Sequence, residues 1–105
     1  MQTKGWTNVK PETVEQWIGR EEVQMIDVRS VGEYMEGHIP GAKLIPLDQL
    51  DVRTFEIDKN REIVCVCRSG KRSASACEYL ASLGFSKVMN MDGGMSAWSG
   101  AISTQ

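Results

Sequence analysis

Short apolar runs alternate with longer amphipathic segments along the chain. The apolar runs predict four strands, at residues 24–28, 43–45, 62–67 and 87–91, and the run at 62–67 is the clearest of them. The segments between the runs have the spacing or the end signals of helices. Such alternation is typical of a parallel sheet that carries helices on both faces, so the pattern predicts an α/β fold.

Two helices are well marked by their spacing. The first covers residues 11–18, where proline suits the first turn and apolar residues recur at i, i+3 and i+4, at Val14, Trp17 and Ile18. The second covers about residues 71–83, with an apolar face at the same spacing and Gly84 beyond its end. We see no linker, repeat or low-complexity segment, so residues 1–105 are expected to form one domain.

The remaining segments are short. Ser30 and Glu33 have the spacing of a capping box, which predicts a brief helix that ends before the turn at 38–41. A single helical turn is expected at 46–50, followed by a polar connection over 51–60. Only Phe55 and Ile57 could anchor that connection. Gly93 and Gly94 then turn the chain into a last short helix that carries Trp98.

Composition excludes several classes of protein. Fourteen acidic residues against twelve lysines and arginines give a net charge of −2, which argues against general nucleic-acid binding, because such binding normally shows as a basic excess or stripe. The longest apolar run, residues 63–67, is far shorter than the roughly 20 residues of a membrane span. The first residues contain no apolar signal core, so the cytoplasm is the expected location.

Three cysteines, Cys65, Cys67 and Cys77, are an odd number, which points away from a disulfide framework. The Cα atoms of Cys65 and Cys67 would lie about 6.5–7 Å apart on one strand, at or beyond the usual limit for a disulfide. A metal site built from the cysteines and His38 would lack the usual Cys-x2-Cys pair. Cys65 and Cys77 are therefore interpreted as buried structural residues, and His38 as a structural turn residue.

Cys67 stands in different surroundings. It ends the clearest strand and opens a loop that leads into a helix. Ligands of parallel α/β sheets bind at such carboxyl ends of strands. Gly70 permits the backbone N–H groups to converge, and cations and hydroxyls lie close by, at Arg68, Ser69, Lys71, Arg72 and Ser73. Such a setting favours the reactive thiolate and the binding of a small anion. The alternatives are that the charges are only solvated and that the serines only cap the helix.

The sequence resembles the single-domain rhodaneses, or thiosulfate sulfurtransferases, over nearly its whole length. Asp27-Val28-Arg29, Glu33-Tyr34 and Gly37 to Ala42 are similar to the first signature of that family. Residues 67–72 are similar to its six-residue active-site loop, and Gly93 to Trp98 to its C-terminal signature. The match of three motifs in the right order is specific, whereas a lone cysteine near an arginine would not be.

The resemblance implies a three-layer α/β/α rhodanese-like fold with a five-stranded parallel sheet. It also implies that Cys67 carries sulfur as a persulfide, taken from a small anionic donor such as thiosulfate and passed to cyanide, a thiol or a protein acceptor. Arg68, Lys71 and Arg72 would hold the anionic groups, and Arg72 would close a small sulfur cradle. No metal or organic cofactor is required. Arg29 and Glu33, at i and i+4, are expected to form a local ion pair.

Two other functions remain open. A cell-cycle-type phosphatase or arsenate reductase would also use a cysteine loop, but that loop has five residues between cysteine and arginine, against four between Cys67 and Arg72. A non-catalytic module or persulfide sensor that binds a protein partner is the second alternative. The presence of Cys67 argues against a module that has lost its chemistry, although a sensor would have the same sequence.

Overall fold

A parallel five-stranded sheet forms the centre of the protein. The computed structural model describes residues 5–105. The strands are β1 (Trp6–Val9), β2 (Val23–Asp27), β3 (Lys43–Leu44), β4 (Glu62–Val66) and β5 (Val88–Met91), in the spatial order β1-β5-β4-β2-β3. All four neighbouring pairs are parallel, which confirms the predicted sheet type.

Strand β1 is absent from the pattern-based prediction, which contains only four strands. Its outer residues, Trp6 and Val9, are half-buried, and the two between them are exposed. Among the strands of residues 5–105 it pairs with β5 alone and forms one edge of the sheet. A four-residue edge strand with so little apolar alternation gives a weak signal, and only the family resemblance implied a fifth strand.

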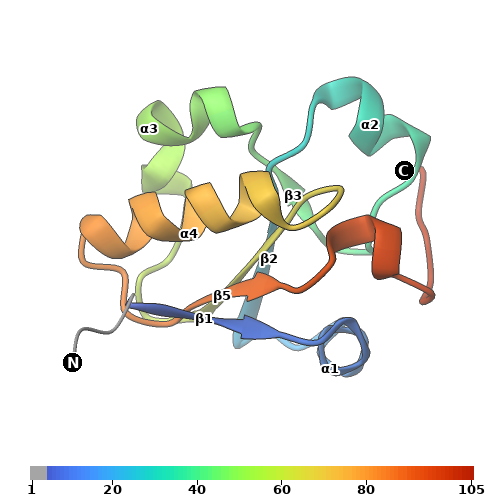
Figure 1. Cartoon of the computed structure of the whole chain (residues 1–105), viewed down its shortest axis with the longest axis horizontal. Coiled ribbons are helices and arrows are strands. Elements are labelled where there is room, and N and C mark those ends of the chain that lie inside the picture. Colours follow the sequence, from blue (N-terminus) through green and yellow to red (C-terminus); the bar gives the residue numbers. More distant parts are fainter. Residues whose placement is uncertain (1–4) are drawn as a thin grey trace.

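Helices cover both faces of the sheet (Figure 1). The helices are α1 (Pro11–Gln16), α2 (Val31–Glu36), α3 (Leu50–Arg53) and α4 (Lys71–Ser82). Three short 3-10 turns complete the structure: η1 (Leu47–Gln49), η2 (Thr54–Glu56) and η3 (Gly94–Ala97). The helix predicted at 71–83 and the capping box of Ser30 and Glu33 are confirmed. None of the helices within residues 5–105 is long and apolar enough to cross a membrane.

The polar connection over 51–60 is helical in its first half. Residues of α3 and η2 continue directly from η1, and Glu56 holds this segment through ion pairs with Arg53 and Lys43. Ile57 is buried as an anchor, but Phe55 is 82% exposed, so that part of the prediction is wrong. Trp98 lies just after η3 rather than within it.

Alternate residues of β4 point to opposite faces and join two separate apolar clusters. Ile63, Cys65 and the following Cys67 belong to the cluster beneath α4, which also contains Cys77 and Leu80. Val64 and Val66 belong to the cluster on the other face, with residues of α1 and η3 beside them. The period of two along β4 therefore directs the side chain of Cys67 toward the start of α4.

Candidate active site at the end of strand β4

Cys67 directly follows the central strand β4, and the loop that it opens leads into α4 at Lys71. Gly70, the residue before the helix, has φ of 98°, a left-handed conformation that favours glycine. This turn brings the chain back over Cys67, so the loop surrounds the sulfur with backbone N–H groups.

The sulfur of Cys67 is buried and hydrogen-bonded. The N–H of Gly70 donates to Sγ at 3.0 Å, and the Ser73 hydroxyl lies 3.3 Å from it. Burial by itself raises the pKa of Cys67, but hydrogen bonds from the Ser73 hydroxyl and from the N–H groups of Ser73, Gly70 and Ser69 outweigh it. The pKa of Cys67 is therefore lowered from its usual value, as the sequence led us to expect of a reactive cysteine.

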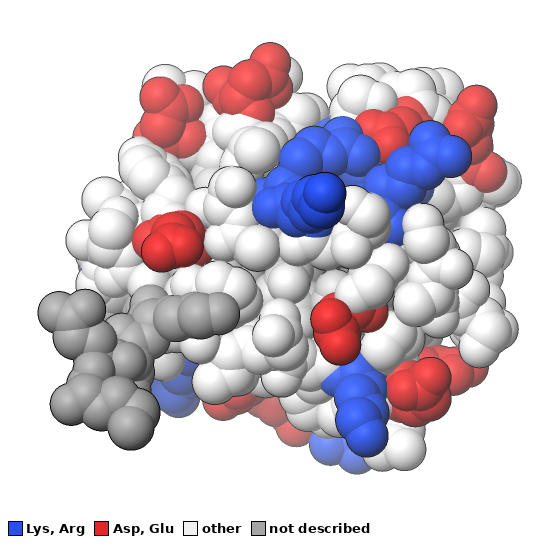
Figure 2. Space-filling model, viewed as in Figure 1, with Lys and Arg blue, Asp and Glu red and all other residues white. Residues whose placement is uncertain are grey.

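The three cations of the loop differ in their contacts. Arg68 and Lys71 are exposed, whereas Arg72 is half-buried. Arg72 forms a bidentate ion pair with Glu33 of α2, in which its two Nη atoms lie 2.8 and 2.9 Å from the carboxylate oxygens. Figure 2 shows lysine and arginine side chains gathered where α4 begins. The positive surface stands beside the buried sulfur, which suits the approach of an anion.

The predicted ion pair between Arg29 and Glu33 is wrong. The guanidinium of Arg29 is buried and binds Asp27 at 2.8 Å and the carbonyl of Gly37 at 2.8 Å. Glu33 instead accepts from Arg72 and caps its own helix through Ser30. Buried Asp27 needs a cationic partner, and Arg29, two residues away, is the nearest one, so Glu33 is left to bind Arg72.

Gly94 allows the η3 segment to lie directly on the loop. A Cβ atom at this position would lie 2.4 Å from the carbonyl oxygen of Cys67 and 2.6 Å from the backbone of Arg68. This close approach lets the N–H groups of Met95 and Ser96 donate to the carbonyls of Cys67 and Arg68, at 2.8 and 2.9 Å. The C-terminal signature, Gly93 to Trp98, therefore holds the backbone of the loop that contains Cys67 in place.

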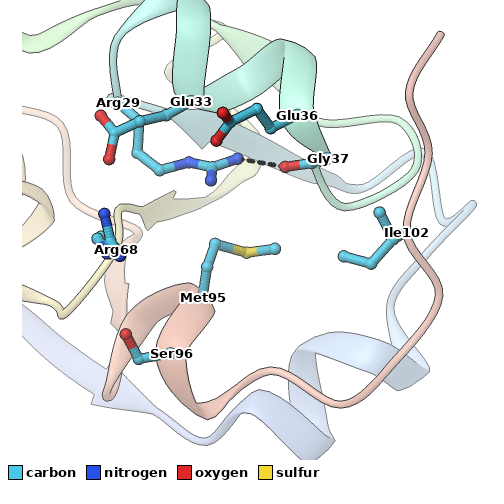
Figure 3. A pocket seen from close by; sticks show the side chains of 8 residues that line it. All are labelled: Arg29, Glu33, Glu36, Gly37, Arg68, Met95, Ser96 and Ile102. Atoms are coloured by element: carbon cyan, nitrogen blue, oxygen red, sulfur yellow. Dashed lines mark hydrogen bonds between the residues drawn. The ribbon is translucent and has the colours of Figure 1, made fainter.

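A pocket of about 410 Å³ adjoins the loop through Arg68 (Figure 3). Arg29, Glu36 and the Gly37 carbonyl line the side formed by α2, and Met95 and Ser96 of η3 line the opposite side. Ile102 closes one end. The pocket combines charged and apolar groups, and it could hold the rest of a molecule whose reacting atom lies in the loop.

Sequence reasoning missed Asn90, a residue of β5 that contacts the loop. Its side-chain oxygen accepts a hydrogen bond from Ser73, and its nitrogen donates to Asn8 of β1 at 3.1 Å and to the carbonyl of Gly70 at 3.3 Å. Asn90 is only 5% exposed. A polar residue inside an otherwise apolar strand was the signal that could have revealed it.

Cys65, Cys77 and His38 are buried, as the sequence indicated. Cys65 and Cys77 are buried and free, and no group of three or more potential metal ligands occurs within residues 5–105. A hydrogen bond with Cys77, together with burial, raises the pKa of Cys65 well above its usual value. His38 stacks on Tyr34 with ring centres 3.6 Å apart and is buried in its turn, which agrees with a structural role.

Comparison with known proteins gives a consistent family. The chain is 42% identical over 78 residues to a sulfurtransferase of Allochromatium vinosum, covering 74% of this chain and 73% of the relative. It is 36% identical over 88 residues to the thiosulfate sulfurtransferase GlpE of Pseudoalteromonas translucida, covering 82% of each chain. The structure resembles a rhodanese-like domain protein of Staphylococcus aureus with a TM-score of 0.85 and 33% identity, covering 94% of this chain and 98% of that one.

The description of the matching family model is the rhodanese-like domain, and the match extends over residues 10–101. It includes both flanking signatures and the cysteine loop between them. The family and the names of the relatives together support sulfur transfer as the general activity. The chain therefore belongs to the rhodanese-like domain family.

Proposed function

We propose that the protein is a sulfurtransferase that carries a sulfane sulfur on Cys67, from thiosulfate or a similar anionic donor to cyanide, a thiol or a protein thiol. The observation that carries this proposal is the position of Cys67 Sγ, which lies at the end of β4 in hydrogen-bond contact with Gly70 N–H and the Ser73 hydroxyl. Together with the lowered pKa of Cys67, this position supports a nucleophilic thiolate.

The first half of the cycle forms a persulfide. The Cys67 thiolate attacks the outer sulfur of thiosulfate, the S–S bond of the donor breaks, and sulfite leaves with the electron pair. Backbone N–H groups of the loop stabilise the sulfur anion, and the exposed Arg68 and Lys71 attract the anionic donor. Arg72 supplies a further positive charge, which Glu33 partly neutralises.

The second half of the cycle delivers the sulfur. Cyanide or a thiolate attacks the outer sulfur of the persulfide, the bond to Cys67 breaks, and the thiolate of Cys67 is restored. With cyanide the product is thiocyanate, and with a thiol it is a new persulfide. Because Cys67 has no exposed surface, the loop has to open in each half-reaction to admit the attacking or departing group.

Intact mass spectrometry after incubation with thiosulfate tests the proposal. We expect one added sulfur, about 32 Da, that maps to Cys67 and is removed by a thiol. The Cys67→Ser variant should remain at the mass of the unmodified chain, and the Cys65→Ala variant should gain the sulfur. The gain of mass should accompany release of sulfite, and added cyanide should yield thiocyanate.

Two results would contradict the proposal. Addition at Cys65 or Cys77 would show that another residue carries the sulfur, and no addition from thiosulfate or from an alkyl persulfide would exclude a carrier role. Hydrolysis of p-nitrophenyl phosphate faster than sulfur transfer would instead favour the phosphatase class.

A further inference from the structure

The Ser73 hydroxyl faces two groups that compete for its single proton. One is Cys67 Sγ at 3.3 Å, and the other is the side-chain oxygen of Asn90. A serine hydroxyl can donate only one hydrogen bond, although it can accept two more. Ser73 is fully buried and Asn90 is 5% exposed, so this competition takes place inside the protein.

The orientation of the Asn90 amide follows from its contact with Gly70. The backbone carbonyl of Gly70 lies 3.3 Å from the amide nitrogen, and a carbonyl oxygen can only accept. Turning the amide over would place two acceptor oxygens against each other. The nitrogen of Asn90 therefore faces Gly70, and its oxygen faces Ser73 and requires the hydroxyl proton.

We propose that Asn90 is a positioning residue that holds the Ser73 proton, so that Ser73 donates to the sulfur of Cys67 only by releasing Asn90. While Cys67 is a thiol, Ser73 donates to Asn90 and offers a lone pair to the S–H group. When the thiol loses its proton, the hydroxyl of Ser73 rotates toward the thiolate, and the oxygen of Asn90 loses its donor. The proton of Ser73 never leaves its oxygen in this exchange.

The exchange makes the stabilisation of the thiolate smaller than one unopposed hydrogen bond would give. The gain of a bond to the charged sulfur is offset by the loss of the bond to Asn90, whereas the N–H of Gly70 has no second acceptor within residues 5–105 and acts in full. If Cys67 carried a persulfide, the Ser73 hydroxyl would likewise donate either to the outer sulfur or to Asn90. The proposal rests on the role of Cys67 as the nucleophile, but it concerns ionisation and not the identity of the donor.

Several charged and titratable groups surround Cys67 besides this pair. Arg68, Lys71 and Arg72 belong to its own loop and to the start of α4, and Arg72 is paired with Glu33 of α2. Asp27, at the end of β2, lies within the electrostatic reach of Arg72, and Cys65 of β4 within that of Cys67. The substitutions used below leave all of these groups in place.

The test is the pH profile of alkylation of Cys67 in four proteins: the unmodified chain, Asn90→Leu, Ser73→Ala and the double variant. Iodoacetamide reacts with the thiolate, and peptide mass spectrometry separates Cys67 from Cys65 and Cys77. The rate at low pH, divided by the plateau rate at high pH, reports the thiolate fraction independently of access. Asn90→Leu removes the competing oxygen, so this ratio should rise roughly three- to tenfold.

The effect of Ser73→Ala should depend on residue 90. In the unmodified background the ratio should change by less than about threefold, because the two hydrogen bonds of Ser73 offset each other. In the Asn90→Leu background Ser73 donates freely, so the same substitution should lower the ratio by roughly tenfold. Ser75→Ala is the matched control, since this exposed serine on α4 donates its hydroxyl to the carbonyl of Lys71 and should have no effect.

A tenfold fall of the ratio for Ser73→Ala alone would overturn the proposal, because it would show that Ser73 donates to the thiolate without competition. This single variant decides the question even if Asn90→Leu does not fold. A fall of the ratio for folded Asn90→Leu would also overturn it. Such a fall would mean that Asn90 only anchors the loop, and that losing the anchor makes the thiolate of Cys67 less stable. Failure of sulfur transfer would leave all these outcomes unchanged, because alkylation needs no sulfur donor.

Discussion

Cys65 and Cys67 are separated by one residue, face the same helix and are both without exposed surface, yet the protein treats them in opposite ways. Cys65 lies within β4, where the sheet uses its backbone groups and its side chain meets Cys77. Its pKa is raised. Cys67 lies just past the end of the strand, where backbone N–H groups turn toward its sulfur, and its pKa is lowered.

The difference shows that burial alone does not make a cysteine inert. The cost of burying a charged sulfur is present at Cys67 as well, but the turn at Gly70 supplies donors that an extended strand cannot direct at one of its own side chains. Reactivity is set by the place where the strand ends. Three predictions test this contrast.

The largest expected effect is on turnover. Cys67→Ser should lower the rate of thiocyanate formation by more than about a thousandfold, because a serine hydroxyl is not ionised near neutral pH and cannot carry the sulfur. Cys65→Ala and Cys77→Ala should retain most of the rate per folded molecule. The measurement is the steady-state assay with thiosulfate and cyanide. Near-full activity of Cys67→Ser, or its loss in Cys65→Ala, would reverse the roles assigned to the two cysteines.

The next prediction removes the support of the loop without touching a cysteine. Gly94→Ala places a Cβ against the carbonyl of Cys67 and requires alanine at φ of +60°. Either the loop or η3 has to move, so we expect a loss of roughly 2–4 kcal/mol in the free energy of unfolding. Turnover should fall with it, because the cradle around Cys67 is displaced.

Gly32→Ala is the matched control for that substitution. Gly32 lies in α2, has no positive φ, and has open space where a Cβ would stand. Alanine there should be neutral or stabilise the protein by up to about 1 kcal/mol. Urea denaturation of both variants measures the difference. Equal stability of Gly94→Ala and Gly32→Ala would mean that η3 does not constrain the loop.

The sequence predicts the parts of this site that lie close together in the chain. The strand, the turn at Gly70 and the start of α4 fall within a few residues of Cys67, and their local signals are strong. Contacts between distant residues were missed. Arg72 meets Glu33 from 39 positions away, and Ser73 meets Asn90 from 17. Their pairing depends on how the elements pack, which periodicity does not specify.

The smallest expected effect concerns the ion pair beside Cys67. Glu33→Gln keeps the capping box, since glutamine can replace glutamate there, but removes the negative partner of Arg72. Because both side chains are partly exposed, the cost at neutral pH should be less than about 1 kcal/mol. The less neutralised Arg72 should favour the thiolate, so the alkylation profile of Cys67 should move to lower pH, while Cys65 stays unreactive.

The acid dependence of stability gives this prediction its sign. The hydrogen bond from Arg72 lowers the pKa of Glu33 from 4.5 to about 2. A carboxylate with a lowered pKa stabilises the folded protein above its unfolded pKa, and this contribution is lost as the pH falls through the folded value. The difference in unfolding free energy between the unmodified chain and Glu33→Gln should therefore close between pH 4.5 and about 2.

Glu56→Gln separates the effect on acid-dependent stability from the effect on the alkylation of Cys67. Glu56 is also paired with an arginine, Arg53, and its pKa is likewise lowered to about 2, but it lies on η2, outside the residues that contact the Cys67 loop. It should show a similar acid-dependent loss of stability with no change in the alkylation of Cys67. If both variants moved the Cys67 profile equally, the effect would come from net charge, and Glu33 would have no local influence on the loop.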